Sequence, residues 1–516
     1  MSRLHLRIAS TVTFSTLALV GLSAPVGLDE TPARAPEPLY RRISLADLGK
    51  PVPVDPRFRA GVVGTTIAAP EGGSAGGQAT RQAYEIFLPP AGMAVRAGEP
   101  SVGVNWNTGN IMFQAYTETD RVTIDESTDP PQATWMNVTA PNSRVSLDPI
   151  LFTDPISGRT AMSQLVPPCS ISAVTPDDGE TWIPSTGCGV PGSADHQSIA
   201  GGPYATPEAH PHKLEDRAMY YCGQSILFAN CSLSTDGGIT YGAAAPAYTN
   251  VNPELDSLAS GGSCLGLHGH LKVGPDGTLY LPNFGCLSPE GEQVQGVAVS
   301  EDDGLTWDVR TIPGALYNDF KSDPSIAIAR DNTLYFVYEP KKGAPRVVVS
   351  HNKGKDWTFP VTLGREFDMK YGVFPAAVAG DGNRAAVAFL GTPDEGKTKE
   401  AYEDAKYAGV WHLYVSSTYD GGKTWKTVKV TGKDPVQRGC IWWGNGSCTS
   451  AYRNLLDFMD ASLDKFGRVV VGYADGCMDV CVTDPKINTL TDVGAIARQA
   501  SGLSMFSEYD KMFSKN

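Results

Sequence analysis

Short runs of apolar and β-branched residues, separated by turns rich in Gly, Asp and Asn, recur along most of the chain after Glu99. In one example, Ser325–Ala329 and Thr333–Val337 flank the polar turn Arg330-Asp331-Asn332. Runs of this kind are typical of β-strands, and a short polar turn between two of them predicts an antiparallel pair. Seven such units are recognisable, and they begin near Glu99, Asp148, His196, His268, Asp323, Phe374 and Asp457.

A second pattern, Ser/Thr-x-Asp-x-Gly-x-Thr-aromatic, follows five of these units. Its copies are Thr175–Trp182, Ser234–Tyr241, Ser300–Trp307, Ser350–Trp357 and Thr418–Trp425. The fourth copy departs from the pattern at Asn352 and Asp356. An Asp side chain can accept hydrogen bonds from backbone amides ahead of it, Gly supplies a positive φ, and the aromatic ring fills the space between neighbouring sheets. We therefore interpret the aspartates of this pattern as structural and not as catalytic acids.

The repeats predict an all-β fold, a β-propeller, because a propeller grows by adding sheets around one axis and not by splitting into separate cores. The seven units predict seven four-stranded blades, with six blades as the alternative. We expect residues 83–510 to form the propeller, closed by an N-terminal strand at Ala83–Leu88 beside Gly494–Ala500. Glu395–Ala408 is the one convincing helical run, and it is predicted to be an insertion within the sixth blade.

The beginning of the chain has the pattern of a secretory signal. Arg3 and Arg7 precede the uncharged stretch Ile8–Ala24, which ends in small residues. A transmembrane anchor is the alternative, but Ser and Thr dilute the apolar run, and it is short for a spanning helix. We expect a signal peptide at residues 1–24, with cleavage possible as late as residue 35, and a mostly irregular extension over residues 25–82. The mature protein would then be secreted and free of the membrane.

All ten cysteines lie beyond that segment, and none forms a C-x-x-C pair. An even number of cysteines in an exported chain favours disulfides over zinc. Each cysteine has a near neighbour in sequence, so we expect five local pairs: Cys169–Cys188, Cys222–Cys231, Cys264–Cys286, Cys440–Cys448 and Cys477–Cys481.

Charge narrows the range of partners. The formal net charge is −14, and no run of lysines or arginines interrupts the acidic balance. Phosphate backbones and anionic membrane surfaces would be repelled on average. We therefore exclude nucleic acid and anionic membranes as partners, and the oligomeric state stays open.

The five repeats and the units before them resemble the Asp-box (bacterial neuraminidase repeat) proteins, roughly over residues 83–502. Cys264–His270 and Arg453–Asp457 look like segments of the secreted bacterial exo-α-sialidase family. The resemblance implies a glycoside hydrolase that releases terminal sugars, sialic acid among them, from extracellular glycans. Asp boxes also occur in non-enzymes, so a non-catalytic propeller that binds a glycan or a protein is the alternative. Another propeller hydrolase or lyase is a third reading.

Topology predicts where a site would lie. If each Asp box joins the third strand of a blade to the fourth, the innermost strands all begin at the opposite end of the propeller, and polar residues at those starts converge there. The candidate catalytic residues are Glu99, Asp148, Asp323, Tyr371 and Asp457, because a proton donor and a stabilising group must meet at one bond. The candidate substrate-binding residues are Arg453, Arg217, His196, His268 and His270. An Asp before Pro, as in Asp148-Pro149, can also simply cap a turn.

Sialidase chemistry, as the resemblance implies it, needs three arginines around the substrate carboxylate, a tyrosine nucleophile with a glutamate, and an aspartic acid. The chain departs from this pattern. The Arg-Ile-Pro motif is absent, and Tyr40–Ser44 is only a faint echo of it. No third arginine joins Arg453 and Arg217. Two His-x-His pairs could suggest a metal, but without a third ligand we predict neither a metal nor a cofactor.

Overall fold

The computed structural model describes residues 46–69, 82–146, 148–166, 169–185, 195–225, 228–250, 262–265, 267–317, 322–340, 343–396, 401–441 and 447–513. The expected signal peptide and the pair Cys169–Cys188 therefore lie, wholly or in part, outside the described residues. Within the described residues, no helix is both long enough and apolar enough to cross a membrane.

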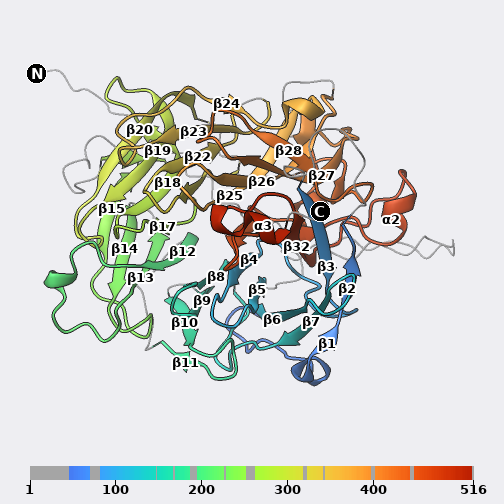
Figure 1. Ribbon diagram of the computed structural model, residues 1–516, viewed down its shortest axis with the longest axis horizontal. Coiled ribbons are helices and arrows are strands. Elements are labelled where there is room, and N and C mark those ends of the chain that lie inside the picture. Colours follow the sequence, from blue (N-terminus) through green and yellow to red (C-terminus); the bar gives the residue numbers. More distant parts are fainter. Residues whose placement is uncertain are drawn as a thin grey trace, which may run out of the picture. The chain divides into compact units, whose positions relative to one another are not determined.

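The fold is all-β, and its sheets take a β-propeller arrangement around a common centre (Figure 1). The first two sheets have the orders β1-β7-β6-β5-β4 and β11-β10-β9-β8. Their strands are β1 Val62–Val63, β4 Ser101–Val104, β5 Ile111–Ala115, β6 Glu118–Asp125, β7 Gln132–Asn137, β8 Pro149–Thr153, β9 Thr160–Val166, β10 Cys169–Thr175 and β11 Ile183–Pro184.

The next sheet contains two antiparallel meanders that β16 joins into one hydrogen-bonded sheet of nine strands. Its strands are β12 Asp195–Gly202, β13 Ala218–Gln224, β14 Phe228–Ser234, β15 Ala245–Asn250, β16 Ser263–Cys264, β17 Lys272–Val273, β18 Leu279–Leu287, β19 Gln293–Ser300 and β20 Asp308–Leu316.

Three further sheets complete the set, in the orders β21-β22-β23-β24, β25-β26-β27-β28 with β29 beside β27, and β2-β3-β32-β31-β30. Their strands are β21 Ser325–Ile328, β22 Leu334–Tyr338, β23 Arg346–Ser350, β24 Val361–Thr362, β25 Tyr371–Ala379, β26 Ala385–Thr392, β27 Val410–Thr418, β28 Lys426–Lys429, β29 Gln437–Arg438, β2 Thr65–Ile67, β3 Ala83–Leu88, β30 Asp460–Leu463, β31 Val469–Asp475 and β32 Val493–Ser501.

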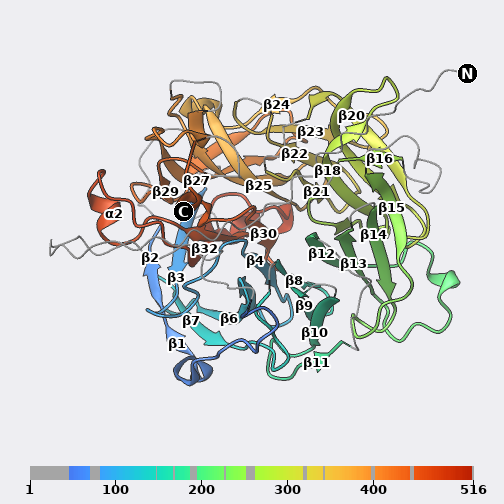
Figure 2. The ribbon, with the colours of Figure 1, turned by 180° about the vertical axis from the view of Figure 1, so that it is seen from behind.

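All seven predicted strand pairs are present as antiparallel pairs. The first strands of these pairs contact one another in the order β4, β8, β12, β17, β21, β25, β30, and β30 contacts β4 near the middle of the arrangement (Figure 2). The N-terminal strand β3 pairs antiparallel with the late strand β32, where Phe87 faces Ile496. Both of these residues are buried, so the two ends of the described chain share one core.

The helical segments are short: η1 Pro56–Ala60, η3 Pro207–Ala209, η5 Arg365–Phe367, η6 Ala401–Glu403, η7 Ser450–Arg453, α2 Val480–Thr483, η8 Ser507–Tyr509 and α3 Asp510–Phe513. The helix expected at Glu395–Ala408 is wrong for the described part of that segment, which holds only the single turn η6. The segment does lie between β26 and β27, as an insertion in that sheet. The aromatic residues of the segment explain the difference. Tyr402 and Tyr407 both pack against Trp411, and this packing holds the segment in place without a regular helix.

The five copies of the second pattern are hereafter called the repeat turns, and four of them share one set of hydrogen bonds. In Thr418–Trp425, Asp420 accepts from the Thr424 amide at 2.9 Å and from its hydroxyl at 2.6 Å, while the Thr418 hydroxyl accepts from the Gly422 amide at 3.0 Å. Asp177, Asp236 and Asp302 make the same contacts. Gly422 has a φ of 84°, which a residue with a side chain rarely adopts. These aspartates are therefore committed to turns.

The fourth repeat turn keeps the hydrogen bond from the backbone amide, but the direction of its side-chain hydrogen bond is reversed. Asn352 accepts from the Asp356 amide at 2.9 Å, and its own side-chain NH2 group donates to the Asp356 carboxylate at 2.7 Å. In the other copies a threonine hydroxyl donates to an aspartate. The two departures in the sequence therefore compensate for each other.

The repeat turns lie at the opposite end of the sheets from the starts of the innermost strands. In the sheet of β12 to β15, Asp195 pairs with Gln224, whereas Gly202 pairs with Ala218 at the other end. Ser234, which opens a repeat turn, pairs with Met219 and so lies at the Gly202 end. We call the end where the innermost strands begin the mouth. The sequence-based argument placed the candidate site at this end.

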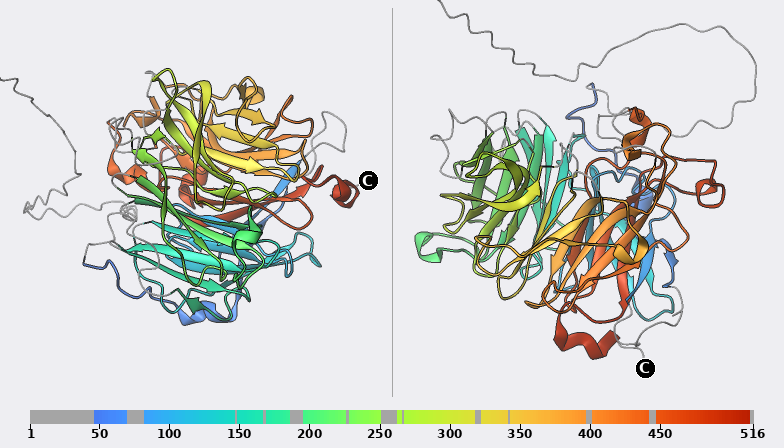
Figure 3. Two further views of the ribbon diagram at one scale, coloured as in Figure 1. Left: turned by 90° about the vertical axis from the view of Figure 1, so that its left-hand side faces the viewer. Right: turned by 90° about the horizontal axis from the view of Figure 1, so that it is seen from above.

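The C-terminal segment covers hairpin turns at the end opposite the mouth. The Phe506 ring contacts Trp106 at 5.6 Å and lies 3.7 Å from the Arg330 guanidinium. Arg384 donates to Asp510, and Ser507 donates to Asp381. Figure 3 shows the terminal red helix projecting from one side of the sheets. Turns from several sheets are thus tied together at that end.

Four of the five expected disulfides form: Cys222–Cys231, Cys264–Cys286, Cys440–Cys448 and Cys477–Cys481. The first joins facing positions on β13 and β14, and the second joins β16 to β18. Each confirmed pair links near neighbours in sequence, as the spacing predicted.

Candidate functional site

Three ionisable side chains meet at the mouth, where β4 and β30 begin. Glu99 precedes β4 and is 5% exposed. Its amide donates to the carbonyl of Leu455, which brings it beside the segment before β30. The Glu99 carboxyl group lies close enough to Asp457 for the two to interact electrostatically, and Arg453 donates two hydrogen bonds to the Asp457 carboxylate. Glu99 and Asp457 thus form one acid pair, anchored by a guanidinium.

The surroundings of Glu99 and Asp457 shift the pKa values of the two carboxyl groups in opposite directions. Burial raises the pKa of Glu99 well above its usual range, and the nearby charges of Asp457 and Asp148 raise it further, against a smaller opposing effect of Arg453. Burial acts on Asp457 in the same sense, but the ion pair with Arg453 outweighs it, and the pKa of Asp457 is lowered. Glu99 is therefore the member of the pair that holds its proton more tightly, and Asp457 is the member that ionises first.

A second pair of titratable groups lies at the same end. The His196 Nε2 atom is 2.9 Å from Oδ2 of Asp323, and the two side chains are 6% and 12% exposed. His196 has a φ of 50°, and the register of β12 against β13 shifts at this point, between Asp195 and Gln197. A bulge of this kind re-aims a side chain. It turns His196 away from its own sheet and toward a carboxylate from another.

Asp148 lies beside both pairs and is 7% exposed. Its Oδ2 atom accepts from the backbone amide of Gln197 at 3.0 Å, and its charge acts on Glu99. The contact with Gln197 fixes Asp148 to the strand that carries His196. If Asp148 only capped a turn, it would not need this contact with a strand of another sheet.

His268 and His270 complete the histidine cluster around Phe458. The His196 ring lies 5.5 Å from the His268 ring, and the His270 ring lies 4.4 Å from that of Phe458. Burial lowers the pKa of His268 to about 3 and that of His270 well below its usual range. Both imidazoles are therefore neutral at physiological pH and offer packing and hydrogen bonding instead of charge.

A cavity at the mouth is lined by several of these residues: His270, Asp323, Phe374, Asp457, Phe458 and Asp460. Asp460 was not among the predicted residues. Its Oδ2 atom accepts from the amide of Val102 at 3.1 Å, and its Oδ1 atom is 4.0 Å from the Lys272 ammonium. Burial raises the pKa of Asp460 in spite of Lys272.

Tyr116 is a further residue that the sequence-based argument missed. It is 5% exposed, its hydroxyl donates to the carbonyl of Ser146, and it packs against Leu456. Burial raises its pKa well above the usual range, and the charges of Glu99 and Asp148 add to the effect. Tyr116 directly follows β5, and the second strand of an antiparallel pair ends where the first begins. Strand ends as well as strand starts should therefore have been searched.

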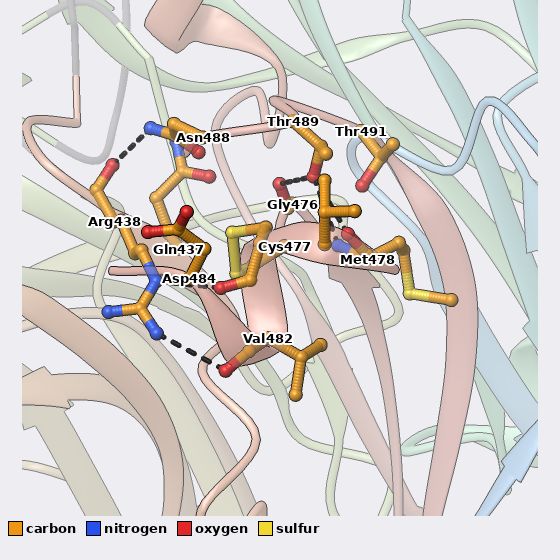
Figure 4. The surroundings of a disulfide bond; sticks show 12 residues. Gln437, Arg438, Gly476, Cys477, Met478, Val482, Asp484, Asn488, Thr489 and Thr491 are labelled. Atoms are coloured by element: carbon orange, nitrogen blue, oxygen red, sulfur yellow. Dashed lines mark hydrogen bonds between the residues drawn. A yellow bond between two sulfur atoms is a disulfide. The ribbon is translucent and has the colours of Figure 1, made fainter. Parts of the chain in front are cut away.

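The loops near the disulfide Cys477–Cys481 hold the segment that carries Arg453 and Asp457. Gln437 donates to the Asn454 side chain at 2.9 Å, and Asn454 donates to the Thr491 carbonyl at 2.7 Å. Arg438 donates to the carbonyls of Cys481 and Val482, next to the disulfide (Figure 4). A buried network therefore fixes the residue between Arg453 and the start of β30.

Two predicted residues are not brought into this cluster. Tyr371 is 2% exposed, its hydroxyl donates to the Glu395 carbonyl at 2.9 Å, and its ring packs against Tyr402 and Tyr407. Arg217 lies at the opposite end of the sheets, where its Nε atom donates to Asp154 at 2.6 Å. Arg217 comes directly before β13, and a second strand begins at the end away from the mouth. Strand direction accounts for its position.

Within the residues that the structure describes, no group of three or more His, Cys, Asp or Glu side chains is placed to hold a metal ion.

No protein-family profile matches the chain, and no curated protein matches it. Among solved structures, the chain is similar to a protein of unknown function from Dyadobacter fermentans, with 14% identity, 80% of this chain and 97% of that chain covered, and a TM-score of 0.39. It is also similar to the Aleuria aurantia lectin (10% identity, 65% and 96% covered, TM-score 0.38). A third similar structure is the NanB sialidase from Streptococcus pneumoniae (10% identity, 80% and 70% covered, TM-score 0.36). At this level of similarity, a conclusion about function must come from the site itself.

Proposed function

We propose that the protein is a secreted glycoside hydrolase of the Asp-box propeller type, which releases terminal sugars from extracellular glycans. One observation carries this proposal: the buried carboxyl group of Glu99 lies beside Asp457, which Arg453 holds by two hydrogen bonds, and burial raises the pKa of Glu99. Hydrolysis of a glycosidic bond needs a carboxylic acid that is still protonated at working pH, so that it can protonate the leaving oxygen.

The two carboxyl groups of that pair act as one unit in this scheme. In glycosidases with two carboxyl groups, these groups stand about 5 Å or more apart, on either side of the bond. Asp457 lies beside Glu99, and its negative charge raises the pKa of Glu99, so Asp457 serves to keep Glu99 protonated. Water then attacks the anomeric carbon and loses its proton to His196, which Asp323 orients. Asp148 adds negative charge that stabilises the oxocarbenium-like transition state.

The proposal includes a ring of seven four-stranded blades closed by β3. Its support is the cyclic order of contacts from β4 to β30, the pairing of β3 with β32, and the five repeat turns, four of which share one set of hydrogen bonds. We assign residues 83–510 to this propeller. Secretion is supported by four disulfides, since disulfides persist outside the reducing cytosol.

A propeller that binds glycans without cleaving them is the second candidate. One observation favours it: Glu99 and Asp148 are only 5% and 7% exposed, so little of either carboxyl group meets solvent at the mouth. A binding site would use the carboxylates that line the cavity, and it would need no proton donor.

A panel of fluorogenic glycosides separates the two candidates. We expect the purified protein to cleave at least one of them, and Glu99→Gln to lower kcat by roughly 100-fold or more, because the amide cannot donate the proton. The matched control is Glu208→Gln, on an exposed loop, which should stay within about twofold. Turnover unchanged by Glu99→Gln contradicts the assigned acid. Glycan-array binding without turnover of any glycoside favours the second candidate.

A further inference from the structure

We infer that the mouth accepts an uncharged terminal sugar and rejects sugars that carry a carboxylate, including sialic acid and uronic acids. This inference names the substrate class of the site described above and rests on the proposed function. It follows from the placement of charges around the cavity, where Arg453 and Lys272 both lie against carboxylates of the protein.

The strongest cation at the mouth is committed to a carboxylate of the protein. Arg453 donates from both terminal nitrogens to the two oxygens of Asp457, the bidentate geometry that an acidic sugar would need. The second cation, Lys272, is 4.0 Å from Asp460. An acidic sugar would have to displace one of these carboxylates in order to gain a cation.

Displacement would leave a carboxylate in an unfavourable place. Asp457 already lies beside Glu99, which Asp148 also influences. Without Arg453, the Asp457 charge would lie in a largely buried acidic cluster with no compensating cation, and the added sugar carboxylate would increase the repulsion. Arg217 does not relieve this, since it is bound to Asp154 at the far end of the sheets.

Neutral sugars match the same groups. Ionised carboxylates only accept hydrogen bonds, and sugar hydroxyls donate them. Asp323, Asp457 and Asp460 line the cavity together with the Phe458 and Phe374 rings. Acceptor oxygens next to apolar rings suit the hydroxyl edge and the C–H face of a neutral pyranose.

Matched substrates that differ in one carboxylate test the inference. We would compare kcat/KM for fluorogenic glucosides with glucuronides, galactosides with galacturonides, and a sialoside. The expected result is turnover of at least one neutral member, with its acidic partner and the sialoside at least about 50-fold lower. Efficient cleavage of the sialoside or a uronide overturns the inference and leaves the hydrolase intact. Cleavage of none of these glycosides counts against the hydrolase instead.

Binding supplies a readout that does not depend on turnover. On an array of neutral and acidic glycans, the Glu99→Gln protein should retain neutral ligands only. Asp457→Asn removes the carboxylate that occupies Arg453, so it should raise binding of uronic-acid or sialylated glycans by about tenfold or more. Wild-type preference for acidic glycans, or no gain of acidic ligands in Asp457→Asn, contradicts the proposed role of the Arg453–Asp457 pair.

Discussion

His196 and Asp323, which come from two separate strand units, meet at the mouth with 2.9 Å between Nε2 and Oδ2. A second pair of the same type, His210 and Asp303, has 3.0 Å between the corresponding atoms, but it lies beside a repeat turn at the opposite end. The described residues thus include two His–Asp pairs of similar geometry in different places. One lies in the candidate site, and the other ties a loop to a turn.

We predict that Asp323→Asn lowers kcat/KM by roughly 10- to 1,000-fold on any glycoside the protein cleaves, because an amide cannot stabilise the positive charge that His196 gains as a base. Steady-state kinetics on the purified variant measure the loss. The thermal midpoint should fall only slightly, because the amide can still hydrogen-bond to the imidazole.

Asp303→Asn is the matched control for that prediction. Asp303 accepts from the amides of Ala205 and Thr206 and from the Tyr220 hydroxyl, so its replacement should reduce stability and leave kcat near the wild-type value. Equal losses of activity in the two variants would mean that the His196–Asp323 pair has only a structural role.

The pH dependence of activity should reflect the acid pair. The rate requires protonated Glu99, so it should fall as pH rises through the raised pKa of Glu99. Asp457→Asn removes a like charge next to Glu99 and leaves Arg453 nearby. Both changes lower the pKa of Glu99, so the alkaline limb of the kcat/KM profile should move to lower pH. An alkaline limb that stays in place, or moves to higher pH, would exclude Glu99 as the group that controls it.

Much of the candidate site could be predicted because antiparallel strands leave little freedom in direction. Once the repeat turns fix one end, the starts of the inner strands must lie at the other, and Glu99, Asp148 and His196 do. The same rule, applied fully, would have found Tyr116 at a strand end and would have excluded Arg217. Tyr371 could not be excluded in this way, because β25 is buried on both faces and the sequence does not say which face meets the mouth.

The sequence predicted which residues lie at the mouth, but not which side chains pair with each other there. Pairing of Arg453 with Asp457 and of His196 with Asp323 depends on bulges and on loops between sheets. The expected helix at Glu395–Ala408 failed for a related reason, because helix propensity is weak compared with tertiary packing of Tyr402 and Tyr407.

The fourth repeat turn provides a test of its compensating residues. Asn352→Asp alone places two carboxylates opposite each other, at positions 352 and 356, and loses the side-chain hydrogen bond between them. We expect a loss of about 1 kcal/mol in the free energy of unfolding, limited by solvent exposure. The double variant Asn352→Asp/Asp356→Thr restores the common pattern and should recover most of that loss in denaturant titrations. Additive effects of the two substitutions would contradict the compensation.

A buried acid pair on β6 should make stability fall with increasing pH. Asp120 is 0% exposed, and burial together with Glu118 raises its pKa well above the usual range. In the unfolded chain an aspartic acid loses its proton near pH 4, whereas folded Asp120 retains it. The folded state therefore binds more protons, and the stability due to this group is present in acid and is lost as pH rises through its folded pKa.

Asp120→Asn should remove that loss, because an amide stays neutral and can donate to the Glu118 carboxylate. We expect the variant to be more stable than wild type at pH 8, by on the order of 1 kcal/mol, and nearly equal to it at pH 4, as measured by thermal unfolding. The control is Asp125→Asn on the same strand, where hydrogen bonds from Ser127 lower the pKa of an exposed carboxylate. That control should give no gain at pH 8. A gain in Asp125→Asn equal to that in Asp120→Asn, or no gain in Asp120→Asn, would show that the buried pair does not govern the alkaline loss of stability.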